Sequence, residues 1–129
     1  MKLLRRRLPV LVLCLALLAP ACAQNAPPNL SPAGVIAWQA TKVITALDVV
    51  RDIAVDASNT TPPLVAHDTM LKVVAWHKTA ITIARSAPAG WPQTIKTSLA
   101  ATQQLLTPAE RKQLDPYFSL VIVLLNEVP

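Results

Sequence analysis

Glycine is almost absent from this sequence of 129 residues: its two glycines, Gly34 and Gly90, lie far apart. A phosphate-binding loop needs several glycines in close succession, because the backbone N–H groups must approach the phosphate directly. The Gly-x-Ser-x-Gly turn that presents a nucleophilic serine in α/β-hydrolases is also missing. The sequence therefore excludes the common nucleotide-binding loops and this form of nucleophilic catalysis.

Cysteine and glutamate are equally scarce. Both cysteines, Cys14 and Cys22, fall within the first two dozen residues, and the only glutamates are Glu110 and Glu127. A glycosidase with paired carboxylates needs an acid in an apolar pocket that faces a second carboxylate across a cleft. Nothing in the sequence supplies that arrangement, so we predict a protein that is not an enzyme and expect no catalytic, cofactor-binding or metal-ligating residue.

The N-terminal segment has the three-part layout of a secretory signal peptide. Residues 1–7 are basic, residues 8–18 form an apolar run, and residues 19–24 are mostly small. The apolar run is shorter than the roughly 20 residues that a membrane-spanning helix needs. We therefore predict a signal peptide at residues 1–23, cleaved after Ala23, and no transmembrane span in the mature chain.

Cleavage before Cys22 is the alternative. The sequence Ala-Pro-Ala-Cys at residues 19–22 loosely resembles the lipobox of bacterial lipoproteins, in which the cysteine becomes the lipid-bearing first residue. That motif usually has leucine three residues before the cysteine, where this sequence has Ala19. Cys22 is therefore a candidate lipidation site, and a lipidated protein would be anchored to the outer membrane rather than released.

The positive charge of the chain lies largely in this leader. The sequence has 12 basic and 7 acidic residues, and four of the basic residues precede residue 8. A mature chain from residue 24 would carry eight basic residues against seven acidic ones, with no basic cluster. We therefore expect no nucleic-acid partner.

The 12 prolines lie between periodic segments rather than inside them and so mark their boundaries. Residues 24–30 read as a proline-containing linker, and residues 31–129 as one helical domain. Thr107, Pro108 and Glu110 carry a capping-box signal for a helix start. The predicted fold is an all-α bundle of four principal helices at about residues 31–57, 63–86, 92–106 and 116–128, with a short helical segment at 108–114.

The first predicted helix, residues 31–57, combines a broad apolar stripe with one polar strip. Asp48, Asp52 and Asp56 follow each other along that strip at steps of four residues, a spacing at which like charges repel slightly. A solvated face, an acidic surface for a partner and a site for a hard cation all fit this pattern. A single helix offers few ligands to a cation, so we predict partner contact or solvent.

Arg51 projects into the apolar side of the same helix, about 40° from Leu47. Such a charge must either extend its head to solvent or meet a carboxylate. Asp48 is the local candidate, and Asp115 or Glu127 could approach from the C-terminal segment.

Aromatic residues make up only 4% of the sequence, and three of them are tryptophans. Trp38 projects to the polar side of its predicted helix, whereas Trp76 and Trp91 fit the edge of a core. Tryptophan is enriched at binding hot spots. The predicted partner-contact residues are Trp38, Asp48, Arg51, Asp52 and Asp56.

The two histidines, His67 and His77, are ten residues apart on one predicted helix. Helix geometry separates them by about 80° and about 15 Å, so they cannot ligate the same ion. His77 lies in the apolar stripe, as a hydrogen-bonded core histidine would. An axial haem ligand, either His77 or Met70, is the alternative.

These observations predict an exported, non-enzymatic helical bundle. We expect it to be periplasmic or secreted and to bind an unidentified protein partner in the bacterial envelope or outside the cell. The alternatives are a lipoprotein anchored through Cys22 and a helical metal or haem carrier.

Overall fold

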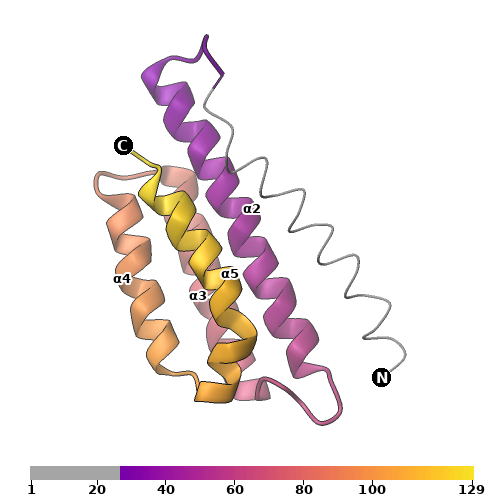
Figure 1. The fold of residues 1–129 in the computed structure, drawn as a ribbon. Helices are drawn as coiled ribbons and strands as arrows, with labels where there is room; N and C mark the ends of the chain where they lie inside the picture. The colour runs from indigo at the N-terminus through magenta and orange to yellow at the C-terminus, as the bar shows by residue number, and fades with distance from the viewer. Residues whose placement is uncertain (1–26) are drawn as a thin grey trace.

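A computed structural model describes residues 27–129, which form four helices (Figure 1). They are α2 (Pro32–Ser58), α3 (His67–Ser86), α4 (Trp91–Gln104) and α5 (Pro108–Asn126). The predicted all-α bundle is confirmed. The predicted signal peptide, its cleavage site, Cys22 and residues 24–26 of the predicted linker lie outside the described residues.

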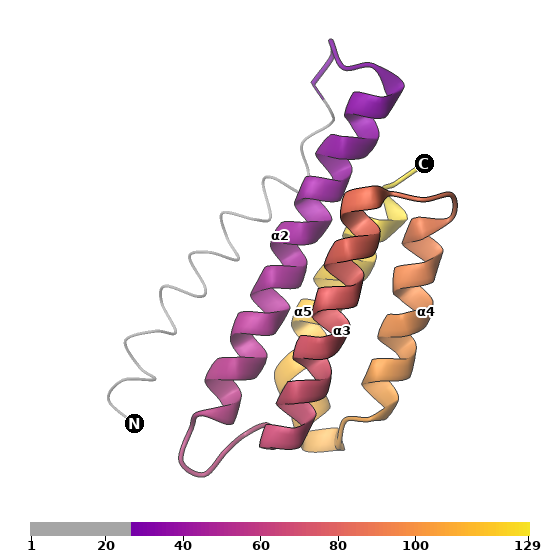
Figure 2. The same cartoon turned by 180° about the vertical axis from the view of Figure 1, so that it is seen from behind.

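The helices form a closed ring in which each packs against two neighbours. α2 contacts α3 and α5, and α4 contacts the same two helices from the opposite side, as the two views in Figures 1 and 2 show. Successive helices run in opposite directions, as short connections require. The ring encloses one core, to which α2 contributes Val43, Leu47, Val50 and Ala54, all fully buried and at helical spacing.

Two of the helix starts are capped by side chains, and the cap at Thr107 is the predicted one. The Ser31 hydroxyl accepts a hydrogen bond from the Gly34 N–H at 3.1 Å, and Pro32 is the first helical residue of α2. Thr107 and Glu110 form a complete capping box at the start of α5. These caps satisfy N–H groups that have no partner within their own helix.

The predicted start of α3 near residue 63 is wrong, because the helix begins at His67. The preceding loop is fixed by the end of α2 instead: Leu64 and Val65 both donate backbone hydrogen bonds to the Ala57 carbonyl. Val65 is fully buried, so this loop contributes to the core without being helical.

The predicted break before residue 116 is also wrong. α5 is a single helix through Pro116, although proline removes one intrahelical hydrogen bond. Leu114 and Phe118, on either side of this proline, are both fully buried. We infer that burial of this continuous apolar face outweighs the lost hydrogen bond.

Trp76 and Trp91 belong to the core. The Trp76 indole N–H donates to the Ser98 hydroxyl at 2.9 Å, and its ring meets Phe118 edge to face at 5.8 Å between centroids. Trp91, the first residue of α4, is buried as well. Their role is therefore to join α3, α4 and α5 rather than to present an aromatic surface.

Candidate functional site

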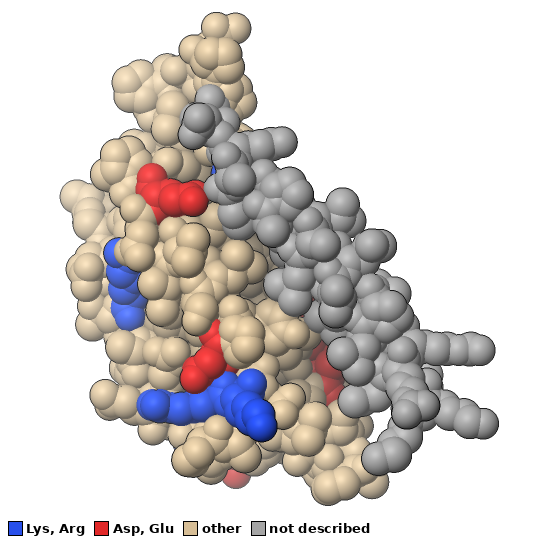
Figure 3. All heavy atoms as spheres, viewed as in Figure 1, with Lys and Arg blue, Asp and Glu red and all other residues tan. Residues whose placement is uncertain are grey.

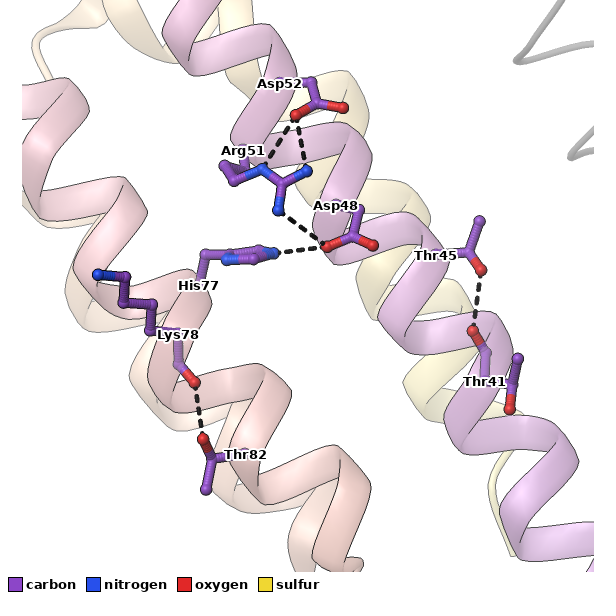
Figure 4. A network of polar contacts seen from close by, with 8 residues as sticks. All are labelled: Thr41, Thr45, Asp48, Arg51, Asp52, His77, Lys78 and Thr82. Carbon is purple, nitrogen blue, oxygen red and sulfur yellow. Dashed lines mark hydrogen bonds and ion pairs between the residues drawn. The ribbon is translucent and has the colours of Figure 1, made fainter.

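The polar strip of α2 meets α3 in a network that we name the Asp48 cluster: Asp48, Arg51, Asp52 and His77 (Figure 4). One oxygen of Asp48, Oδ1, lies 2.8 Å from His77 Nε2 and 3.4 Å from Arg51 Nη1. The carboxylate accepts from both groups. It therefore connects the two helices and holds an arginine at the same point.

Arg51 lies between two carboxylates of its own helix. Its Nη2 is 2.9 Å from Asp52 Oδ1, and its Nε donates to the same oxygen at 2.9 Å. The arginine thereby offsets the repulsion between Asp48 and Asp52, which one turn separates. The predicted local partner, Asp48, is confirmed, whereas Asp115 and Glu127 are not among the ion-pair partners of Arg51 that the described residues show.

The four side chains of the Asp48 cluster differ in their exposure to solvent. The side chain of His77 is 8% exposed, whereas those of Arg51, Asp48 and Asp52 are 38%, 44% and 65% exposed. The imidazole thus lies beneath a carboxylate surface that solvent or a partner can reach. With two aspartates against one arginine, the exposed side chains of the cluster carry a net negative charge.

His77 fits the hydrogen-bonded core histidine of the sequence prediction. Ligation of a haem or metal through Nε2 would require breaking the bond to Asp48. Among residues 27–129, no three His, Cys, Asp or Glu side chains form a group that could hold a metal ion. From the sequence, Asp48 was predicted as a partner-contact residue and His77 as a core histidine. No sequence pattern indicated that the two side chains form a pair.

The remaining predicted contact residues lie elsewhere on α2. Asp56 is exposed two turns beyond Asp48. Trp38 is ten residues before Asp48, about 15 Å along the helix axis, and the Lys42 ammonium lies 3.8 Å from the centroid of its ring. The structure therefore places Trp38 outside the Asp48 cluster.

A second carboxylate, which the sequence indicated only as a local cap, joins two helix starts. Glu110 Oε1 accepts from the Thr107 N–H at 3.0 Å and Oε2 accepts from the Ala66 N–H, at the start of α3, at 2.9 Å. Burial by itself would raise the pKa of Glu110. The backbone N–H groups of Thr107 and Ala66, with hydrogen bonds from the Thr69 and Thr107 side chains, outweigh that effect and lower the pKa below its ordinary value of 4.5.

Charged groups are sparse on the face drawn in Figure 3. In the upper part of this view the charged side chains stand apart on uncharged surface, lower down an acidic side chain touches basic ones, and the projecting end at the top shows no charged group. By length and hydropathy, α2 meets the criterion for a membrane-crossing helix, and it is the one such helix among residues 27–129. Core helices of soluble proteins can meet the same criterion, and eight residues of α2 are buried in the bundle.

The chain matches no protein-family model, no curated protein and no solved structure.

Proposed function

We propose that this protein is an exported, non-enzymatic helical bundle that binds a protein partner through the Asp48 cluster and Asp56. The observation that carries the proposal is the arrangement of half-exposed Asp48 and exposed Asp52 beside buried His77. His77 of α3 holds Asp48 and Arg51 holds Asp52, so a partner would meet a surface that is already ordered. Less conformational entropy is then lost on binding.

The charge of this surface defines the chemistry of the partner. The strip carries three aspartates, Asp48, Asp52 and Asp56, and one arginine, Arg51, so a surface that presents lysine or arginine side chains is complementary. Exposed charges act mainly on the association rate and its salt dependence. Binding should therefore weaken as the salt concentration rises.

A capture experiment tests the proposal. The processed protein is immobilised and exposed to envelope extract and culture medium of the producing cell, and the captured proteins are identified and compared between variants. Asp52→Asn combined with Asp56→Asn should lose the partner. Glu127→Gln, which removes an exposed carboxylate at the end of α5, should retain it. Equal capture by both variants would exclude this surface.

The location belongs to the same proposal: periplasmic or secreted after cleavage following Ala23, or anchored to the outer membrane through Cys22. Mass spectrometry of the mature N-terminus separates the two. A peptide beginning at Gln24 supports release, whereas a diacylated peptide beginning at Cys22 establishes the lipoprotein.

The metal or haem carrier is the second candidate function, and it rests on His77 and half-buried Met70 in α3. Because His77 Nε2 is bonded to Asp48, this candidate requires that bond to break on loading. An absorption spectrum and metal analysis of the protein purified from its native source test it directly.

A further inference from the structure

The N-terminal end of α2 extends past the other helices, as Figures 1 and 2 both show. No residue from 31 to 39 is buried, and the first buried residue of the helix is Ala40. At the limit of the bundle, Gln39 Nε2 donates to the Glu127 carbonyl at 3.0 Å and so connects α2 to the end of α5. We name the projecting residues 32–38 the α2 tip.

The α2 tip is apolar on all sides. Ile36, 38% exposed, continues the stripe that faces the core further along the helix, and Trp38 projects to the opposite side. Residues 27–41 contain no charged side chain. A helix that is apolar all round is normally enclosed by a protein core or by a membrane, and the bundle does not enclose this one.

We propose that the α2 tip inserts into the interface of a phospholipid membrane. Its seven residues are about 10 Å long, which matches the roughly 5–10 Å to which interfacial helices enter the boundary between headgroups and acyl chains. Leu30, 39% exposed and next to the tip, adds apolar surface at the same end. This proposal goes beyond the proposed function and uses a different surface.

The size of the tip argues against a second copy as its occupant. A stable protein interface buries about 800 Å² on each partner. Four of the seven tip residues are proline, alanine or glycine, so two tips in contact would provide far less area. A lipid phase needs no matching surface, because it closes around whatever apolar side chains enter it.

The base of the tip suits the boundary of a membrane. Trp38, the last residue of the tip, stacks with Lys42 one turn further on. Tryptophan is enriched at the headgroup level, where a lysine ammonium can reach lipid phosphates. Exposed Glu127 lies at the level of Gln39 and would remain in water.

Vesicle sedimentation tests the proposal. A full-length gene carrying Cys22→Ala, which removes the candidate lipidation site, is expressed and exported, and the processed protein is mixed with phosphatidylethanolamine–phosphatidylglycerol vesicles. We expect binding, and we expect Ile36→Ser with Trp38→Ser to reduce the partition coefficient by about tenfold or more. The matched control is Leu71→Ser in α3, which changes a leucine that is 51% exposed near the opposite end of the bundle. It should leave binding unchanged.

Thermal melts establish whether the tip variant is folded, as expected because neither substituted residue is buried. Absence of vesicle binding by the unsubstituted tip would overturn the proposal, as would equal loss in the tip and Leu71 variants. A dimer in the absence of vesicles that Ile36→Ser converts to a monomer would also overturn it, in favour of a second copy as the occupant.

Discussion

Asp48 of α2 and Glu110 of α5 each form a hydrogen bond to α3 or its N-cap residue, but the groups that they bind differ. Half-exposed Asp48 bonds to two side chains, His77 and Arg51. Buried Glu110 bonds to the backbone N–H groups of Ala66 and Thr107. Both of those N–H groups stand at helix starts, where no intrahelical acceptor is available.

Because of this difference, we expect Glu110 to contribute to the stability of the bundle and the Asp48 cluster to contribute to partner binding. The N–H groups that Glu110 satisfies are held in place by their helices, so loss of the carboxylate leaves polar groups unpaired. The side chains around Asp48 can turn toward water, because Asp48 and Arg51 are already partly exposed. The Glu110 junction is therefore expected to hold the bundle together, and the Asp48 cluster is free to serve contact at little cost to folding.

Glu110→Ala is expected to have the largest effect. It leaves the N–H groups of Thr107 and Ala66, whose hydrogen bonds to Glu110 are partly buried, without their acceptor. An unsatisfied polar group costs about 1–3 kcal/mol when it is shielded from water. We expect the free energy of unfolding to fall by ~2–4 kcal/mol in urea titrations. A loss below ~1 kcal/mol would show that water replaces the carboxylate and that the junction does not stabilise the bundle.

Acid should remove part of the same stabilisation. Because the pKa of Glu110 is lowered in the folded protein, its ionised form stabilises the fold. That contribution is complete above the unfolded value of 4.5 and is lost as the pH falls through the lower folded pKa.

Urea titrations of the unsubstituted protein and of Glu110→Gln, from about pH 6 down to about pH 3, measure this loss. The stability difference between the two proteins should shrink below about pH 4.5. Other carboxylates are common to both proteins and cancel in the comparison. A difference that is constant across the range would contradict a lowered pKa at Glu110.

Asp48→Ala should have an intermediate effect. It removes the acceptor of His77, whose side chain is only 8% exposed, and we expect a loss of ~1–2 kcal/mol. Replacing both partners, as Asp48→Ala with His77→Leu, should recover part of that loss, because no buried donor then lacks a partner. Additive losses in this double-mutant cycle would indicate that the pair contributes no coupling.

Arg51→Met should have the smallest effect. The arginine is 38% exposed and its ion pairs are solvated, so we expect a change in the free energy of unfolding below ~1 kcal/mol. Asp52→Ala should fall in the same range. If either variant lost ~3 kcal/mol or more, the cluster would behave as a buried salt bridge, and its separation from the Glu110 junction would be wrong.

The local features of this fold could be predicted from the sequence. The Ser31 cap, the Thr107–Glu110 capping box and the approximate extents of α2 and α4 follow from residue types within a few positions of each other. The contact between Arg51 and Asp48 was predictable for the same reason, since it spans three residues of one helix. Such features depend on helix periodicity and on capping chemistry alone.

Only the tertiary structure decided which distant groups meet. Pairing of Asp48 with His77 depends on how α2 and α3 are aligned, and the second hydrogen bond of Glu110 depends on α5 bringing it to the start of α3. Continuity of α5 through Pro116 and the late start of α3 were decided in the same way, because burial in the shared core outweighed the local signals. The sequence determined which segments are helical and apolar; their packing determined which carboxylate stabilises the bundle and which one is left exposed.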